Sequence, residues 1–399
     1  MKLIRRDYYL DKLAAVKDVP DIKVITGVRR SGKSKLMDAF IETFDQDEKT
    51  NVVRIKLNLK KYENLLNPDN LYDYIEEHHV PDKDNYLFID EIQMCTGFER
   101  VINSIYEEEI YDIYLTGSNA FLLSSDLATL FGGRVYEISL YPFSFKEYME
   151  YYSSDNIDEA FELYVKTGGM SGSYLYKTEE DARKYVNRIY RTTITKDIVT
   201  KFRIENEDLL IMIGNFLMDN VGNQTSIRNV AAKLTSGTYK TNDKTVGAYI
   251  AYFCRSFLFY PIQRYDIKGK KYLESDKKYY LSDLSFRYSE IGTKNTDYGH
   301  LYENIIAIEL LRRGYEVYVG KLYDKEIDFV AIKGGKKLYI QVADDISRKD
   351  TFEREVSSLL SINDAYPKML LARTRHDMSQ YEGISIIDIA RWLNDSQNE

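Results

Sequence analysis

Apolar residues in the first 150 positions follow two alternating patterns. Short, largely apolar runs predict buried strands at 22–26, 52–57, 86–89, 113–116 and 135–140. After the first run, Leu36, Ala39 and Phe40 recur at helical spacing. Strand and helix patterns that alternate in this way build a parallel sheet with helices on both faces. We therefore predict an α/β core that ends near residue 150.

Beyond this core the pattern changes. Residues 155–222 are helical throughout, apart from a double glycine at 168–169, and predict a small helical lid. Residues 227–257 hold two helical patterns, and residues 258–281 hold two strands separated by a Lys-Gly turn. Two helices followed by a hairpin are typical of a winged helix, which we predict here.

The last hundred residues return to an α/β pattern. A helix is predicted at 300–313, and three strands follow at 316–319, 327–332 and 337–342. The pair Gly334-Gly335 predicts a hairpin turn between the last two strands.

The Gly-rich turn after the first strand, Gly27-Val-Arg-Arg-Ser-Gly-Lys-Ser34, fits the phosphate-loop pattern GxxxxGK[ST] in full. Glycines let backbone N–H groups wrap phosphates, and the N-terminus of the following helix adds partial positive charge. Lys33 is expected to reach the β- and γ-phosphates of ATP, and Ser34 to bind Mg²⁺. The expected nucleotide contacts are Gly27, Arg30, Ser31, Gly32, Lys33, Ser34 and Lys35.

Two adjacent acids end the apolar run at 86–89. We expect Asp90 to help hold Mg²⁺ and Glu91 to orient and deprotonate the attacking water. Alternatively, Glu91 only caps a helix N-terminus. A complete phosphate loop upstream favours the catalytic role.

Two further polar positions are candidates for catalysis. The run at 113–116 leads into Ser118 and Asn119, and Asn119, or else Ser118, can sense the γ-phosphate. An Asx turn is the alternative. Arg134 follows two glycines, which suits an arginine finger supplied in trans by a second copy of the chain. A surface arginine at a turn is the alternative.

Composition narrows the class of protein. The 399 residues are 44% hydrophobic and 30% charged, as in soluble globular proteins. No apolar run reaches the roughly 18–20 residues that span a bilayer, and the polar start lacks a signal-peptide core. Two distant cysteines and four histidines show no zinc-site spacing. We expect a cytoplasmic protein without a membrane partner.

Charge leaves the partner open. A net charge of −8 argues against a general nucleic-acid coat, but residues 226–290 hold twelve Lys/Arg against six Asp/Glu. Winged helices also serve as protein-interaction or oligomer-packing modules. DNA or RNA, a protein, and a second copy of the chain all remain candidate partners.

Several of these motifs together resemble the prokaryotic AAA-type ATPases that carry a C-terminal DUF4143 domain. They lie at 26–34, 87–93, 115–120, 133–134, 141–148 and 278–283. The resemblance implies an AAA+-like P-loop NTPase core, a winged-helix domain and a C-terminal restriction-endonuclease-like α/β domain similar to PD-(D/E)XK nucleases. The division expected is 1–152 for the ATPase core, 153–222 for the helical lid, 223–292 for the winged helix and 293–399 for the tail.

The nuclease-like fold that the resemblance implies uses a helix carboxylate, a strand aspartate and an acid-x-Lys triplet to hold metal and activate water. Glu303 and Asp328 match the first two positions. The triplet is Gln341-Val-Ala343, which has neither the acid nor the ammonium. We therefore expect a degenerate site in a docking domain.

These observations predict an ATP- and Mg²⁺-dependent ATPase that acts as a molecular switch on a nucleic-acid or protein partner. The alternatives are an ATP-gated, metal-dependent nuclease and a nucleotide-sensing regulatory module with little turnover.

Overall fold

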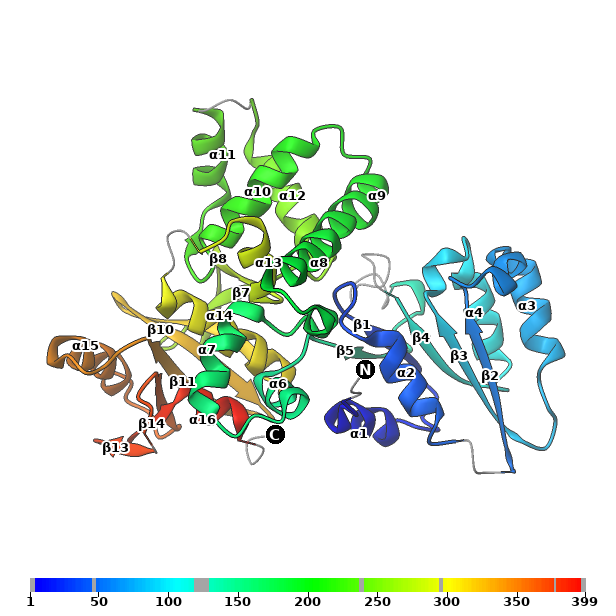
Figure 1. The fold of residues 1–399 in the computed structure, drawn as a ribbon, viewed down its shortest axis with the longest axis horizontal. Coiled ribbons are helices and arrows are strands. Elements are labelled where there is room, and N and C mark those ends of the chain that lie inside the picture. The colour runs from blue at the N-terminus through cyan, green and yellow to red at the C-terminus, as the bar shows by residue number, and fades with distance from the viewer. Residues whose placement is uncertain are drawn as a thin grey trace. The chain divides into compact units, whose positions relative to one another are not determined.

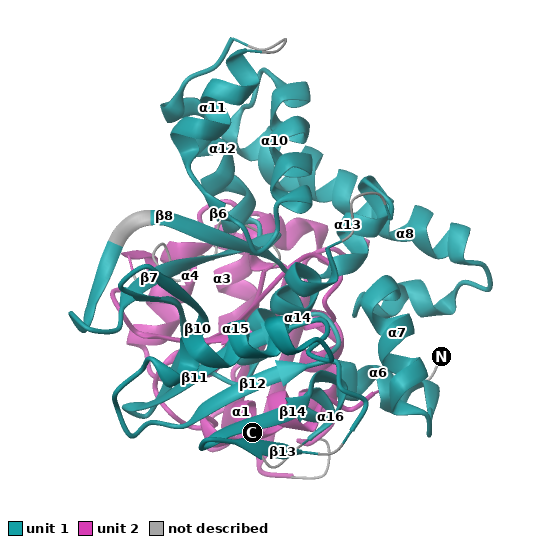
Figure 2. Cartoon of the chain, turned by 90° about the vertical axis from the view of Figure 1, so that its left-hand side faces the viewer, with its two compact units in different colours: residues 1, 141–399 teal, residues 2–140 magenta. Residues whose placement is uncertain are grey.

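The computed structural model describes residues 4–44, 48–117, 129–236, 240–293, 297–376 and 378–395, without the side chains of 274 and 275. The chain forms two compact units, which Figure 2 draws in different colours. Unit 2 comprises residues 2–140, and unit 1 comprises residue 1 with 141–399.

Unit 2 is built on a five-stranded sheet in the order β2-β3-β4-β1-β5 (Figure 1). All neighbouring strands run parallel, which confirms the predicted parallel sheet. Each predicted strand of this region is present to within two residues. The strands are β1 (Ile22–Thr26), β2 (Thr50–Lys56), β3 (Asp84–Asp90), β4 (Asp112–Thr116) and β5 (Val135–Ser139).

Helices cover both faces of this sheet. The first face carries α1 (Asp7–Ala15) and α2 (Lys33–Ile41), and the second carries α3 (Pro68–Glu77) and α4 (Phe98–Glu107). Consecutive strand residues point to opposite faces, so Leu87 packs with α3 and α4 while Phe88 packs with α1 and α2. Short 3₁₀ helices occupy Lys60–Leu66 and Ile92–Met94. Two apolar cores therefore hold the carboxyl ends of the parallel strands in place.

Unit 1 contains a nine-stranded mixed sheet in the order β13-β14-β12-β11-β10-β9-β7-β8-β6. Its strands are β6 (Gln224–Thr225), β7 (Phe259–Asp266), β8 (Lys271–Leu281), β9 (Glu316–Leu322), β10 (Lys325–Lys333), β11 (Lys336–Ala343), β12 (Lys368–Ala372), β13 (Ser379–Tyr381) and β14 (Ile384–Asp388). The predicted hairpin exists as β7 and β8, but β7 also pairs in parallel with β9. The predicted wing is therefore continuous with the tail sheet, and the expected boundary at 292 cuts through one sheet.

Helices make up much of the rest of unit 1, including the region predicted as a lid. They are α6 (Phe145–Tyr152), α7 (Ile157–Thr167), α8 (Glu179–Thr192), α9 (Thr200–Phe202), α10 (Glu207–Asp219), α11 (Ile227–Thr235), α12 (Asp243–Arg255), α13 (Leu284–Glu290), α14 (Tyr298–Arg312), α15 (Lys349–Leu360) and α16 (Ile389–Asn394). The described residues of this unit also form a 3₁₀ helix at Ser171–Leu175 and a π-helical stretch at Thr193–Val199. Helix α15 packs Val356 and Leu359 onto the sheet.

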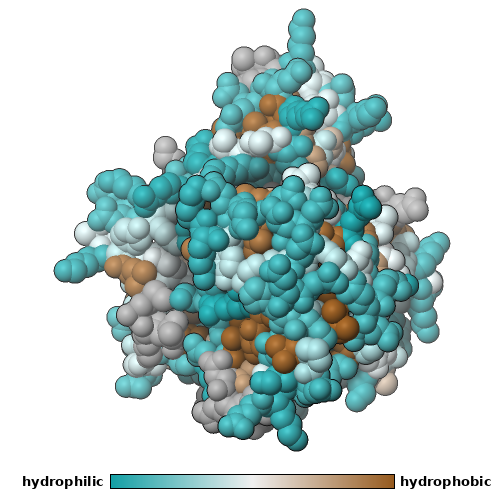
Figure 3. All heavy atoms as spheres, turned by 90° about the vertical axis from the view of Figure 1, so that its right-hand side faces the viewer, coloured by the Kyte–Doolittle hydropathy of each residue, from teal (hydrophilic) through white to brown (hydrophobic). Residues whose placement is uncertain are grey.

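The surface drawn in Figure 3 is largely hydrophilic, with hydrophobic side chains in smaller patches between charged ones. Among the helices that the structure describes, none combines the length and the apolar character needed to cross a bilayer.

Candidate functional site

The Gly-rich loop joins β1 to α2 and depends on residues that adopt left-handed backbone. Gly27 has φ 139°, and a Cβ there would lie 2.1 Å from the carbonyl oxygen of Leu140. Gly32, the N-cap of α2, has φ 106°, and Arg30 has φ 67°. L-residues with side chains rarely adopt such angles, so the loop shape requires glycine at both ends.

The side chains of the loop are arranged around its own backbone. Lys33 is buried, and its Nζ donates to the carbonyl oxygens of Gly27 at 2.9 Å and Val28 at 3.1 Å. Ser31 Oγ is buried with no hydrogen-bond partner among the described residues. A buried hydroxyl without a partner fits a loop that receives phosphate oxygens. Arg30 and Lys35, also predicted to contact nucleotide, are exposed.

Asp90 lies directly beside this loop. Ser34 Oγ donates to Asp90 Oδ1 at 2.9 Å, and Thr116 Oγ1 donates to the same oxygen. Asp90 is only 1% exposed, so its carboxylate is held by neighbours and not by bulk water. The structure thus brings together the two residues predicted to bind Mg²⁺, which lie on β3 and α2.

Glu91 follows Asp90 in a left-handed conformation, with φ 59°. Its backbone N–H donates to Thr116 Oγ1 at 3.1 Å, and Gln93 Nε2 donates to its carboxylate. A non-glycine residue with positive φ at the end of a buried strand is unusual, and such strain concentrates at functional positions. Thr116 therefore orients both acids, one through each bond of its hydroxyl.

Three contributors to this site were missed by the sequence analysis. Thr116 ends β4, which lies beside the strand that ends in Asp90. A polar residue at the carboxyl end of that strand could have indicated its role. Gln93 ends the motif at 87–93, but its sequence position gave it no predicted role. Arg6, which precedes α1, donates from Nη1 to the carbonyl oxygen of Ser31 at 3.2 Å. No sequence motif indicated a role for Arg6.

Of the other predicted catalytic residues, one falls outside the described residues and one lies away from the loop. Asn119, with its alternative Ser118, lies outside the residues that the structure describes. Arg134 forms an ion pair with Glu107, and its carbonyl accepts from Ile22 N–H at 2.9 Å. Ile22 starts β1, whereas the loop follows its end, about 15 Å away for a five-residue strand. Arg134 is therefore at the opposite edge of the sheet from its own phosphate loop.

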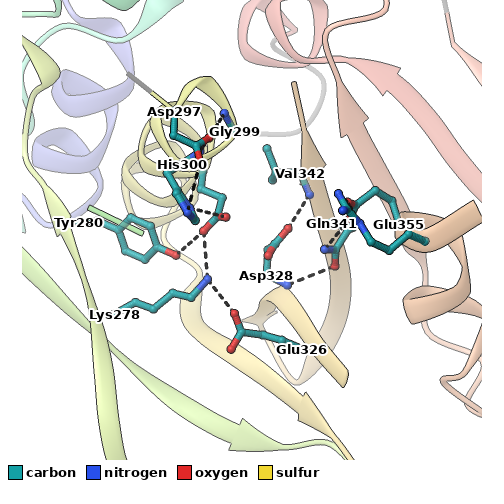
Figure 4. A network of polar contacts seen from close by, with 12 residues as sticks. Lys278, Tyr280, Asp297, Gly299, His300, Glu326, Asp328, Gln341, Val342 and Glu355 are labelled. Carbon is teal, nitrogen blue, oxygen red and sulfur yellow. Dashed lines mark hydrogen bonds and ion pairs between the residues drawn. The ribbon is translucent and has the colours of Figure 1, made fainter. Parts of the chain in front are cut away.

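A second polar cluster lies in unit 1 around Glu303 of α14 (Figure 4). Lys278 Nζ of β8 donates to Glu303 Oε2 at 3.1 Å and to Glu326 Oε1 at 2.9 Å. Tyr280 OH donates to Glu303 Oε2 at 3.2 Å, and His300 Nδ1 lies 3.3 Å from Oε1. An ammonium group therefore lies beside Glu303, although Ala343 provides none.

The other half of this cluster surrounds Asp328, in a β-bulge of β10. Asp328 Oδ2 accepts from the N–H of Val342 at 2.8 Å, and its own N–H donates to Gln341 Oε1 at 3.4 Å. Gln341 Nε2 donates to Glu355 Oε2 of α15 at 2.9 Å. Figure 4 shows Glu355 beyond Gln341 as seen from Asp328. Gln341 is thus used as a bridge between two acids.

Burial and charge shift the pKa values of this cluster strongly. Burial, reinforced by the neighbouring Glu303, raises the pKa of Asp328 well above its usual value. Burial opposes the charged form of Lys278, but the carboxylates of Glu303 and Asp328 outweigh it and raise its pKa. No group of three or more metal-binding side chains is arranged to hold a metal ion in the part of the chain that the structure describes.

Comparisons with known proteins bear on both units. A family model described as an AAA domain matches residues 19–149, and one described as a domain of unknown function, DUF8612, matches 158–297. An uncharacterized protein of Haemophilus influenzae is 36% identical over 398 residues, which is 98% of either chain. An uncharacterized protein of Methanocaldococcus jannaschii is 27% identical over 375 residues, covering 90% of this chain and 81% of that one.

Among solved structures, a Walker-type ATPase of Pyrococcus abyssi is similar with a TM-score of 0.49 and 16% identity, over 72% of this chain and 95% of that one. The AAA match confirms the predicted AAA-type core. The model that matches the middle of the chain is DUF8612, so the expected DUF4143 assignment is not supported. The winged helix and the nuclease-like tail are likewise not confirmed.

Proposed function

The chain belongs to the same family as its Haemophilus influenzae relative and matches an AAA domain at residues 19–149, and we propose that it is an ATPase that works as a molecular switch. In this proposal ATP binds with Mg²⁺ at residues 27–34 of unit 2. Hydrolysis then changes how unit 1 holds a nucleic-acid or protein partner.

The observation that carries the proposal is the 2.9 Å contact between Ser34 Oγ and Asp90 Oδ1. A hydroxyl and a carboxylate are oxygen ligands of the kind that Mg²⁺ prefers, and both lie next to the phosphate loop. Bound Mg²⁺ supplies charge neutralisation at the phosphates. Lys33 supports this charge balance from within the loop.

Glu91 is the proposed general base. Its carboxylate takes a proton from the attacking water, while Gln93 and Thr116 orient it through side chain and backbone. The left-handed backbone at Glu91 turns the residue away from the strand direction immediately after Asp90. Asn119 remains the proposed γ-phosphate sensor of this set.

Arg134 is proposed to act in trans, because its own loop lies at the other end of β1. In other phosphoryl-transfer enzymes, an arginine finger from a neighbouring protein raises kcat about 10³–10⁵-fold. Arg134→Ala should then lose turnover and retain ATP binding. Mixing it with Lys33→Ala should restore part of the activity, since the second variant still offers Arg134. Full turnover by Arg134→Ala alone would contradict the role in trans, and Arg134 would then be a surface residue paired with Glu107.

Cleavage by the tail is not part of the proposal. Lys278 engages Glu303 and Glu326 directly, so the carboxylates of this cluster already have a cation within the protein. We propose that the tail docks a partner.

The test is release of phosphate from Mg²⁺-ATP by the full chain, with Lys33→Ala and Glu91→Gln as variants, with and without DNA or RNA. Turnover that both variants lose supports the ATPase, and stimulation by nucleic acid identifies the partner class. ATP that binds tightly but persists through long incubation, even at high protein concentration, would instead support a nucleotide sensor.

A further inference from the structure

One surface of unit 1 combines tyrosine rings with lysines. The rings of Tyr265, Tyr272 and Tyr318 come from the neighbouring strands β7, β8 and β9, with centroids between 5.1 and 5.9 Å apart. Lys337 of β11 extends the row, since its Nζ lies 4.8 Å from the ring of Tyr265 and 5.8 Å from that of Tyr366. Tyr265 itself is buried, with 5% exposure, and belongs to the core of the unit, so only the neighbouring rings can offer faces to a ligand. We name these five residues, with Lys268 and Tyr323, the tyrosine–lysine surface.

Lys268 and Tyr323 form a second lysine–tyrosine pair at the two turns that follow β7 and β9. Lys268 Nζ lies 4.7 Å from the centre of the Tyr323 ring. The β7–β8 hairpin projects at the edge of unit 1 in Figure 2. Tyr323 is 66% exposed, Tyr272 58% and Tyr366 40%, so these rings present much of their area to solvent. Large exposed rings grouped on a protein surface often mark an interaction site.

Charge around these rings is positive, although the chain as a whole is acidic. Segments 265–273, 316–324, 333–337 and 364–366 hold seven lysines against four carboxylates. Three of the four carboxylates accept local hydrogen bonds. Asp266 accepts from Gly269 N–H, Glu316 from Tyr318 OH and Asp364 from Tyr339 OH. Considering only described residues, none of the seven lysines forms an ion pair.

We propose that the tyrosine–lysine surface binds single-stranded nucleic acid, with bases stacked on the exposed rings and phosphates near the lysines. The inference rests on the proposed function and specifies its partner. Every base has a flat face that stacks on an aromatic ring, and lysines beside the rings follow the backbone charge. A duplex hides those faces within its own stack, so it would use only the lysines. An acidic peptide would likewise leave the rings unused.

The proposal is tested by fluorescence anisotropy of a labelled oligothymidylate of about 15 nucleotides, titrated with the full chain without ATP. The wild type should bind the single strand more tightly than a duplex of equal length. Tyr272→Ala with Tyr323→Ala should weaken binding about tenfold or more, and Phe at both positions should retain it, because stacking needs the ring and not the hydroxyl. Tyr176→Ala is the matched control, since Tyr176 is 39% exposed in another part of unit 1.

Salt dependence gives a second measurement. Phosphate contacts make the logarithm of the binding constant fall linearly with the logarithm of salt, and Lys268→Ala should make that slope shallower. Absence of single-strand binding by the wild type would overturn the inference. Equal binding by the Ala and Phe variants, or equal binding of an acidic peptide, would also overturn it. Either result would mean that the surface binds by charge alone, without base stacking.

The outcomes separate this inference from the proposed ATPase. Lys33→Ala changes only unit 2 and should bind the strand like the wild type in the absence of ATP. ATP turnover without binding of the single strand would contradict the inference and still support the proposed ATPase. Binding of the single strand that depends on the tyrosines, in a chain that does not hydrolyse ATP, would support the inference and contradict the proposed ATPase.

Discussion

The proposed nucleotide site of unit 2 and the polar cluster of unit 1 use similar groups in different ways. Both contain carboxylates and one buried lysine. Lys33 donates to the backbone carbonyls of Gly27 and Val28, whereas Lys278 donates to the carboxylates of Glu303 and Glu326. The Asp90 carboxylate accepts its described hydrogen bonds from hydroxyls, while the Glu303 carboxylate accepts from an ammonium.

The difference concerns where the neutralising charge comes from. Carbonyl and hydroxyl oxygens stabilise charged groups only partly, so a site held by them gains when a phosphate or a cation binds. A buried lysine between two carboxylates is already neutralised by the protein, and adding a ligand would first require breaking those pairs. The first arrangement suits ligand turnover, and the second suits stability of the tail.

The largest expected effect is on turnover in unit 2. Glu91→Gln keeps the shape of the side chain but removes the base, so turnover should fall about 10²–10⁴-fold with ATP binding retained. Glu63→Gln is the matched control, because Glu63 is an exposed partner of Lys60. Phosphate release measures the turnover, and equilibrium binding of ATP measures the retained affinity. Undiminished turnover in Glu91→Gln would remove Glu91 from the chemistry.

The same substitution at the two lysines should separate the two regions. Lys278→Ala leaves Glu303 buried without its ammonium and should destabilise unit 1 by about 3–5 kcal/mol. Lys33→Ala should abolish turnover with a smaller change in stability. Urea unfolding followed by circular dichroism measures the first effect. Lys278→Met with Glu303→Gln should recover much of the loss, since no unpaired charge then remains between those two positions.

A smaller effect is expected at the threonine that joins the two acids. Thr116→Val preserves volume but removes both hydrogen bonds of the hydroxyl. A lost hydrogen bond to a charged group costs about 1.5 kcal/mol, so turnover should fall about tenfold. Steady-state kinetics should show the loss in kcat. Thr43→Val, at the end of α2, is the control and should be unchanged.

The smallest effect concerns pH in unit 1. Burial raises the pKa of Asp283 to about 6, although hydrogen bonds from Ser285 and Gly169 act against this. The folded state therefore binds a proton more readily than the unfolded state, and stability increases as pH falls from 7 towards 5. Asp283 should contribute about 1 kcal/mol across that range. Urea unfolding of wild type and Asp283→Asn at both pH values measures it, and identical pH dependence would contradict the assignment.

Local pattern was sufficient for much of unit 2. Strands at 22–26 and 113–116 were predicted from apolar runs because each is buried on both faces of a parallel sheet. The contact of Ser34 with Asp90 agrees with the motif, since the carboxyl ends of parallel strands meet at one edge. Helix α15 and strands β12–β14 were not predicted, and the continuity of β7 with β9 could not be, because pairing partners leave no mark in a single strand.

The sequence by itself determined the phosphate loop, the acidic strand end and the parallel core, since these depend on residues close together or on a repeated period. Only the tertiary structure decided that Lys278 and Glu355 join Glu303 and Asp328, that Arg134 lies away from its own loop, and that tyrosines from three strands share one surface. The physical reason is distance along the chain. Contacts between residues far apart depend on how sheets and helices pack, and no local pattern records that packing.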